Sequence, residues 1–474
     1  YGMLMAYIFV KMYPELFKLS LKEKRTIFVF LIGYCVLALL PDAARTQRNL
    51  VAVLLLVLAT FTVLSFGAVF TKRKNLMLMT GGFLIAGILF NMYYQYSYEK
   101  DYLSEFSDQG EALDKLETGT DLAVLKTGDE SIYRYDQMGT HSYENSSMQT
   151  GTNSTSYYFS VASGDITNFF NEVDLNTPWD YHYENLDSRT ILDRLAAVKY
   201  FVVKAGEEEY LPYGYDTLAA EAEKKDRLYR AYECKNALPI GYTYDSYIPE
   251  KKYAKMSTVE KQQALLQGVV LADSAVPETT PEFNDREVSY KLVTGSGCKE
   301  KDGKLIITKE NAQAKLVFDG LDECETYLIT EGVDYEALSP RELISDKKWN
   351  KMTLYEQKKV QYENSKWRYW KESQKAYIDV TGQFLDKTIS IFTDKYNAYS
   401  GRSDFLCNTG YSEKGKKSIT LTFENTGVYS YKDMKVVCQP MKNIESQTSR
   451  LGTESLKDVK IKNHELTGSI SVSK

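Results

Sequence analysis

The chain has 474 residues, of which 26% are charged, and 58 Lys and Arg against 64 Asp and Glu give a net charge of −6. This acidic balance argues against a nucleic-acid-binding protein, because such proteins usually carry a strong basic excess on one face. With three histidines and six cysteines that form no CxxC pair, we expect no zinc or other soft-metal site.

Hydrophobic residues are concentrated in residues 1–95, and three apolar runs lie at 27–40, 50–70 and 76–92. A bilayer-spanning helix needs about 20 mostly apolar residues, and these runs approach that length. Residues 1–17 resemble the end of a further helix whose start is missing, and no signal peptide precedes it. The sequence therefore predicts a partial membrane α-helical bundle over residues 1–95, in a chain truncated at its start.

The cations predict the orientation of this segment. Short loops rich in Lys and Arg stay in the cytoplasm. One such loop contains Lys18, Lys22, Lys24 and Arg25, and another, at 72–74, contains three further cations. Tyrosines and acidic residues follow residue 92. We therefore expect a multi-pass protein in which the residues after about 95 are extracytoplasmic.

Residues 96–275 predict an extracytoplasmic α/β domain. Short strands are expected at 121–128 and 131–136, and a helix after Gly164. An amphipathic helix that starts near Asp187 runs directly into a β-branched strand at 198–203, which is typical of α/β folds. Ser257 with Glu260 three residues later predicts a capping box that opens another helix.

The proline-containing linker that starts at residue 276 predicts a domain boundary. From there to 474 many short segments alternate apolar and polar residues between Gly and Asn turns, which predicts an antiparallel β-sandwich domain. A Lys-rich insertion at 345–373 interrupts them. A disulfide between Cys407 and Cys438 is left open, because spacing does not determine pairing.

The 38 tyrosines suggest a surface that handles glycans, because aromatic rings stack on the apolar faces of sugars. The alternative is structural, since tyrosine also suits strands and half-buried surfaces. Arg134 and Arg189 are candidates for holding a phosphate through paired hydrogen bonds, and an ion pair that joins strand to helix is the alternative. No serine-hydrolase, zinc-protease, P-loop or dinucleotide motif occurs in the sequence, so no motif identifies a catalytic residue.

Several segments carry a family resemblance: IYRYD, NSTSYYFSVASGDITNFF, LDSRTILDRLAAVKYFVV, ALPIGYTYDSY and the strand block from AYSGRSDFLCNTGY onward. With these segments the chain resembles the bacterial YfhO-like membrane proteins over most of its length. The most specific parts are the DxR…LxxVKYFV and LPxGYxY stretches. The resemblance identifies a C-terminal fragment whose last strands and final membrane helix are missing.

The resemblance implies a GT-C type glycosyltransferase of the bacterial cell membrane. Its donor would be an undecaprenyl-phosphate-linked sugar, its acceptor a cell-wall polymer such as lipoteichoic acid, and no other cofactor is implied. The family's recurring positions imply substrate binding by Arg134, Tyr157, Asp187 and Arg189. The catalytic acid is expected in an early outer loop outside this chain, so no catalytic residue is assigned.

Two other functions are weighed against glycosyl transfer. The first is a membrane-anchored, non-enzymatic glycan-binding or scaffolding protein, in which the β domain binds wall glycan by itself. The second is a transporter. It is disfavoured because the apolar segments contain almost no ionisable residue apart from Lys11, and transport paths usually need some.

Overall fold

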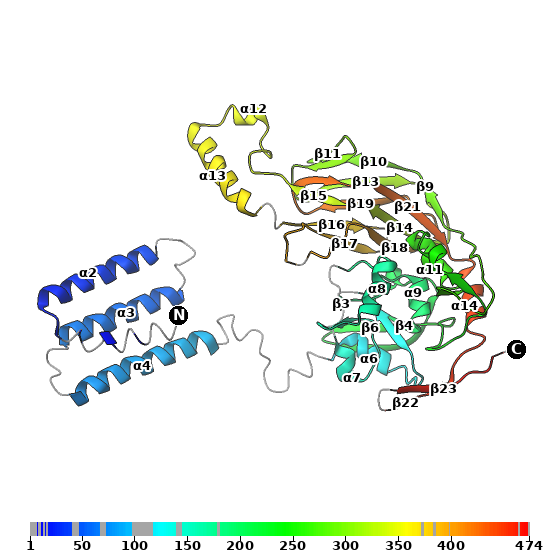
Figure 1. Cartoon of the computed structure of the whole chain (residues 1–474), viewed down its shortest axis with the longest axis horizontal. Coiled ribbons are helices and arrows are strands. Elements are labelled where there is room, and N and C mark those ends of the chain that lie inside the picture. The colour runs from blue at the N-terminus through cyan, green and yellow to red at the C-terminus, as the bar shows by residue number, and fades with distance from the viewer. Residues whose placement is uncertain are drawn as a thin grey trace. The chain divides into compact units, whose positions relative to one another are not determined.

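The computed structural model describes residues 18–39, 47–66, 73–96, 117–138, 145–177, 181–370, 374–382, 385–397, 399–462 and 465–472, with four isolated positions before 18. The chain divides into two compact units, Tyr1–Ala112 and Leu113–Lys474 (Figure 1).

The first unit contains the helices α2 (Leu21–Ala38), α3 (Gln47–Phe66) and α4 (Arg73–Tyr96). α2 begins with a capping box, in which the Ser20 backbone N–H donates to Glu23 Oε2 at 2.8 Å and the Ser20 hydroxyl accepts from the Glu23 N–H. The first turns of α2 contain charges of both signs, at residues 22–25.

In the described part of the chain, no helix is long and apolar enough to cross a membrane. The predicted fold class, which begins with a membrane helical bundle over residues 1–95, is therefore wrong. In α2 the charged residues 22–25 occupy the first turns. They leave the uncharged stretch 26–38, roughly 20 Å of helix, against a hydrocarbon core of about 30 Å. Most of the helix predicted at 1–17 lies outside the described residues.

The second unit begins with a four-stranded mixed sheet in the order β1-β4-β6-β5. Its strands are β1 (Arg134–Gln137), β4 (Val198–Lys204), β5 (Tyr215–Lys224) and β6 (Arg227–Cys234). β1 pairs with β4 in parallel, and the other pairs are antiparallel. The predicted strands at 131–136 and 198–203 thus occur near their expected positions, and β4 lies at the centre of the sheet.

Both faces of this sheet are apolar. Val202 and Ala231 pack on one face with α6 (Gly119–Leu125), and Phe201 and Val203 pack on the other. The segment 121–128 was predicted as a strand, and this is wrong. Thr118 caps a helix there by accepting the Asp121 N–H at 3.2 Å. The N-cap outweighs the short apolar run.

Short elements surround the sheet. They are α7 (Ser146–Thr150), β2 (Tyr157–Tyr158), α8 (Gly164–Glu172), β3 (His182–Tyr183), α9 (Thr190–Leu195), η3 (Glu208–Tyr210), β7 (Tyr247–Pro249), α10 (Glu250–Tyr253), α11 (Thr258–Ala264) and β8 (Val269–Leu271). The predicted helix after Gly164 is α8. The predicted capping box also occurs, because the Ser257 N–H donates to Glu260 Oε2 at 2.8 Å at the start of α11.

Most of the remaining strands form three antiparallel sheets. The first has the order β10-β13-β19-β16-β17, with β10 (Tyr290–Thr294), β13 (Ala312–Phe318), β19 (Ser418–Phe423), β16 (Lys375–Thr381) and β17 (Asp386–Phe392). The second has the order β11-β12-β20-β15, with β11 (Cys298–Lys301), β12 (Lys304–Ile307), β20 (Gly427–Ser430) and β15 (Asp334–Ala337). The third has the order β18-β14-β21-β9, with β18 (Phe405–Ser412), β14 (Cys324–Glu331), β21 (Asp433–Pro440) and β9 (Arg286–Val288).

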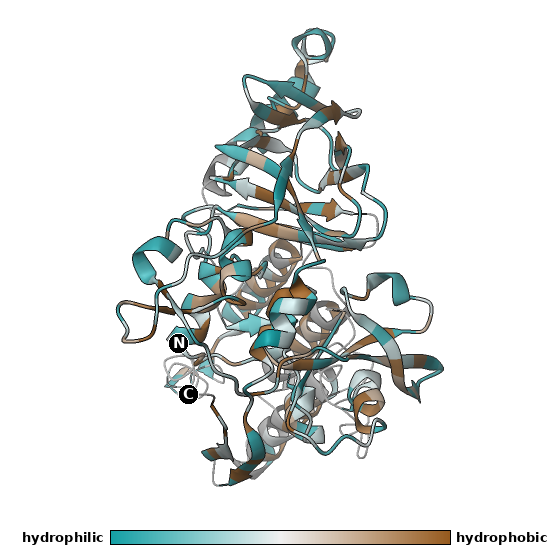
Figure 2. Cartoon of the chain, turned by 90° about the vertical axis from the view of Figure 1, so that its right-hand side faces the viewer, coloured by the Kyte–Doolittle hydropathy of each residue, from teal (hydrophilic) through white to brown (hydrophobic). Residues whose placement is uncertain are grey.

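These three sheets share one core. Leu305, Leu316 and Leu328 come one from each sheet and are buried in the same cluster. Along β13 buried and exposed residues alternate strictly, as expected of a sheet with one buried face. Figure 2 shows the same alternation of apolar and polar residues along several strands of this region. The strands predicted for a two-sheet sandwich are thus shared among three sheets.

Other elements lie outside these three sheets. α12 (Asp346–Trp349) and α13 (Leu354–Trp370) form the Lys-rich insertion, α14 (Ile444–Leu451) follows β21, and β22 (Lys457–Lys462) pairs with β23 (Glu465–Ser469). All six cysteines are buried and free, so the structure contains no Cys407–Cys438 disulfide among its described residues. The domain boundary expected at residue 276, within the second unit, remains a prediction.

Candidate functional site

An open cavity of about 570 Å³ lies beside α8, and it brings together two of the four predicted binding residues, Arg134 and Tyr157. Its walls are mainly apolar and aromatic, with side chains of Phe169, Phe170, Leu192, Leu195, Tyr242 and Tyr244. We call it the aromatic cavity. Cavities of this size with apolar walls and few polar groups are typical of sites for small molecules.

Arg134 is the first residue of β1, and it supplies the cation of the aromatic cavity. Its Nη1 donates to the carbonyl oxygen of Ala196 at 2.7 Å, which orients the guanidinium. Burial lowers the pKa of Arg134, but an arginine remains cationic at neutral pH. Its other guanidinium N–H groups have no partner within the described segments, so they are available to an anionic ligand.

Tyr157 lies on the short strand β2, and its ring centroid is 5.1 Å from that of Tyr183. Its hydroxyl is buried and has no hydrogen-bond partner among the residues that the structure describes. Burial raises the pKa of Tyr157 to about 12, so the hydroxyl is a neutral donor at physiological pH. A buried hydroxyl without a partner is costly, and a ligand oxygen in the cavity would relieve that cost.

Two tyrosines at 242 and 244 also line the aromatic cavity. The Tyr242 hydroxyl donates to Leu195 O at 3.2 Å, and the Tyr244 hydroxyl donates to Leu265 O at 2.6 Å. Their ring centroids are 5.6 Å apart in an edge-to-face arrangement. Because backbone carbonyls hold both hydroxyls, the rings have fixed positions and present apolar surface to the cavity.

α8 forms the outer wall of the aromatic cavity. No residue of this helix is buried, and Ile166 and Phe169 keep 43% and 40% of their surface exposed although they are large and apolar. Asp165 in its first turn lines the cavity as well. The cavity is therefore open to solvent along an apolar edge.

A buried pair of carboxyl groups positions two segments of the cavity. Asp136 at the end of β1 accepts hydrogen bonds from Thr155 Oγ1 at 2.7 Å and from the Leu186 N–H at 3.0 Å, and both of these residues line the cavity. Burial raises the pKa of Asp136. Burial, and then the adjacent Asp136, raise the pKa of Asp193 on α9 well above its ordinary value. No local pattern in the sequence marks this pair, because Asp136 and Asp193 come together only in the fold.

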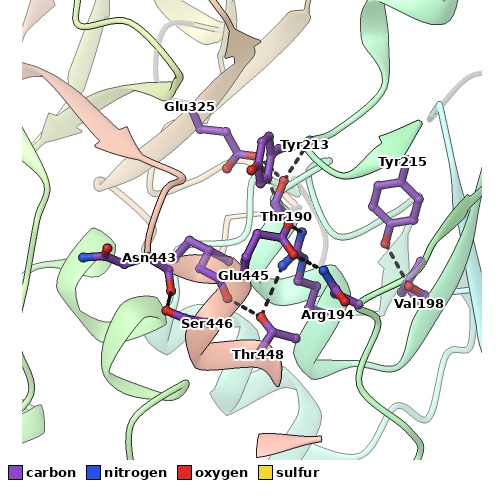
Figure 3. A network of polar contacts seen from close by, with 12 residues as sticks. Thr190, Arg194, Val198, Tyr213, Tyr215, Glu325, Asn443, Glu445, Ser446 and Thr448 are labelled. Carbon is purple, nitrogen blue, oxygen red and sulfur yellow. Dashed lines mark hydrogen bonds and ion pairs between the residues drawn. The ribbon is translucent and has the colours of Figure 1, made fainter. Parts of the chain in front are cut away.

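α9 is held by a polar network that Figure 3 shows. The fully buried Arg194 donates to Glu445 Oε1 at 2.6 Å and to Thr448 Oγ1 at 3.3 Å, both on α14. Thr190 Oγ1 donates to Glu325 Oε1 on β14 at 2.5 Å. Burial raises the pKa of Glu325. Leu192 and Leu195 of the same helix line the aromatic cavity, so this network positions one of its walls.

The other two predicted residues lie outside the aromatic cavity. Arg189 is fully buried; its Nε donates to Gln262 Oε1 at 3.0 Å and its Nη1 to Val173 O at 2.6 Å. Among the described residues it joins α9 to α11 through hydrogen bonds rather than through an ion pair. Asp187 lines a separate polar cavity, where its Oδ1 lies 3.3 Å from Lys387 Nζ. The structure therefore brings Arg134 and Tyr157 together and separates both from Asp187 and Arg189.

Comparisons with known proteins place these features in a family. The family model described as "Bacterial membrane protein YfhO" matches residues 2–474. The uncharacterized protein YfhO of Bacillus subtilis (strain 168) is 27% identical to this chain over 274 residues, which cover 55% of this chain and 30% of that protein. The chain therefore spans less than a third of the length of this curated relative. No solved structure matches the chain.

Proposed function

The chain belongs to the YfhO family of bacterial membrane proteins, and from this membership and the aromatic cavity we propose that it acts in glycosyl transfer at the bacterial cell membrane. In this proposal the protein takes a sugar from an undecaprenyl-phosphate-linked donor and passes it to a cell-wall polymer such as lipoteichoic acid. The described residues contribute ligand binding, and no bond-breaking step is assigned to them.

The observation that carries the proposal is the joint placement of Arg134 and Tyr157 in one aromatic-walled cavity. A lipid-linked sugar has an apolar chain, a phosphate and a ring with one apolar face. The walls suit the chain or the face of the ring. Among the described residues, Arg134 has N–H groups without a partner that suit a phosphate oxygen, and the Tyr157 hydroxyl, also without a partner there, suits a second oxygen.

We further propose that residues beyond about 95 are extracytoplasmic, because lipid-linked donors replace nucleotide sugars outside the cytoplasm. The number of membrane passes stays a prediction. A cysteine at the exposed Ser296, on the turn between β10 and β11, tests the sidedness, since all six native cysteines are buried. A membrane-impermeant maleimide should label Ser296→Cys in intact cells. Labelling only after permeabilisation would place the unit in the cytoplasm and refute the proposal.

Gene replacement tests the glycosyl transfer itself. Arg134→Ala and Tyr157→Phe should lower the sugar content of wall and lipoteichoic acids, measured by NMR of the extracted polymers. The matched controls are Arg286→Ala on β9 and Tyr355→Phe on α13, both at exposed positions away from the cavity. They should leave the polymers unchanged.

The gene deletion decides between enzyme and scaffold. The test requires that the wild type expresses the protein. If deletion of the gene then leaves the sugar substituents of wall and lipoteichoic acids unchanged, glycosyl transfer is refuted and the non-enzymatic glycan-binding alternative takes its place. If the deletion lowers glycosylation and Arg134→Ala does not, the protein acts in glycosylation but the aromatic cavity is not its donor site.

A further inference from the structure

A second, polar cavity of about 340 Å³ is lined by residues 176–177, by residues between 182 and 188, and by the strand β17 with its approach. Its lining includes Asp187, Ser188, Asn185, Lys387 and Ser390. This cavity is distinct from the aromatic cavity, because no residue lines both. We call it the polar cavity.

The turn at residues 187–188 has an unusual backbone. Asp187 and Ser188 have φ angles of 63° and 54°, so two consecutive residues with side chains are left-handed. Such residues persist only where their surroundings hold them, and they gather at functional sites. Here Asn408 Nδ2 donates to Asp187 O at 3.3 Å and to Ser188 O at 2.8 Å, and the Asn176 N–H donates to Asp187 Oδ2 at 2.7 Å.

Ser188 has a hydroxyl without a hydrogen-bond partner among the described residues. The residue lines the polar cavity and is 1% exposed. Buried polar groups in native proteins are almost always paired, so an exception needs a reason. A ligand hydroxyl in the cavity would provide the missing partner.

The charges around Ser188 restrict the ligand. Asp187, Asp386 and Glu184 line the cavity with Lys387, so carboxylates outnumber ammonium groups among its described lining residues. An anionic ligand such as a polymer phosphate would be repelled. A hydroxyl group both donates to a carboxylate and accepts from an ammonium or a serine, so a ligand rich in hydroxyls uses all of these groups at once.

We propose that the polar cavity binds a neutral saccharide unit, with Ser188 Oγ and Lys387 Nζ as direct contacts and Asp187 as an acceptor for its hydroxyls. The site requires neither the aromatic cavity nor any transfer chemistry. The saccharide site therefore goes beyond the proposed function, and a test of one does not decide the other.

Saturation-transfer NMR on the purified 474-residue chain tests this proposal with methyl glycosides of hexoses and N-acetylhexosamines as probes, and with glycerol 3-phosphate as an anion. At least one methyl glycoside should bind saturably, and the anion should not. Ser188→Ala should weaken glycoside binding about tenfold, as expected for one lost hydrogen bond. Its melting temperature should not fall, because the hydroxyl has no partner among the described residues to lose.

Two further variants separate the possible outcomes. Ser296→Ala, an exposed serine on the β10–β11 turn, should bind like the wild type. Ser390→Trp should abolish binding because it fills the polar cavity. The proposal is overturned if no glycoside binds the folded wild type, if Ser390→Trp binds equally well, or if glycerol 3-phosphate binds in preference.

Discussion

Lys416 provides a stability test that depends directly on burial. It precedes β19, is 1% exposed, and its Nζ donates to the carbonyl oxygen of Thr409 and, at 3.2 Å, to Thr409 Oγ1. Burial lowers the pKa of Lys416 to about 7, although the negative charge of Glu325 opposes this shift. In the unfolded chain the pKa of a lysine is about 10.4.

Between these two pKa values the unfolded chain binds a proton that the folded chain lacks. The folded pKa is the lower of the two, so the contribution of Lys416 to stability increases as the pH rises from about 7 to about 10.4. The slope approaches about 1.4 kcal/mol per pH unit above about pH 8, and because the folded group is half titrated at pH 7, the free energy of unfolding should rise by about 2 kcal/mol from pH 7 to pH 9. Well below pH 7 this contribution is constant.

Urea unfolding followed by circular dichroism measures this effect at pH 6, 7, 8 and 9. Other groups titrate in the same range, so the quantity to compare is the difference between the wild type and Lys416→Met, a variant that keeps a flexible apolar side chain. Lys417→Met is the control, because the Lys417 side chain is 71% exposed. A difference that stays flat from pH 7 to pH 9 would refute the assigned pKa and the burial of the ammonium group.

Three substitutions test the packing around the candidate site, each by urea unfolding. Arg189→Leu should lower the free energy of unfolding by about 3 kcal/mol, because two buried acceptors lose their donor. Glu445→Gln should cost about 3 kcal/mol, because it leaves the fully buried Arg194 without its carboxylate. Gly415→Ala should cost at least about 2 kcal/mol, because a Cβ there would overlap backbone atoms, whereas Gly164→Ala, with open space around it, should be nearly neutral. Losses within about 0.5 kcal/mol for the first three would contradict the contacts described.

Elements with strong local signals could be predicted from the sequence. The β-branched run 198–203 is the central strand β4, and Ser257 caps α11. Where two local signals compete, the prediction fails: the apolar run after Asp121 suggested a strand, but the cap at Thr118 makes it a helix. The membrane bundle predicted from the apolar runs is wrong, and in α2 the charged first turns shorten the uncharged stretch.

Pairings between distant segments could not be predicted. β12 pairs with β20, with Lys304 opposite Ser430, and no local sequence pattern predicts which strand β12 pairs with. The candidate site shows the same limit. Arg134 and Tyr157 stand out in the sequence, but Lys387 comes near Asp187 only through the tertiary fold.

The central claim is that the aromatic cavity holds a lipid-linked sugar, and photoaffinity labelling tests it most directly. A polyprenyl-phosphate-linked sugar with a diazirine near the phosphate would be irradiated with the protein in native membranes, and the labelled peptides would be mapped by mass spectrometry. The account predicts labels within 154–170 and 242–265, the segments that carry most of the cavity lining, and their loss in Arg134→Ala. Labels confined to other parts of the chain, or labels in the cavity that persist unchanged in Arg134→Ala, would contradict it.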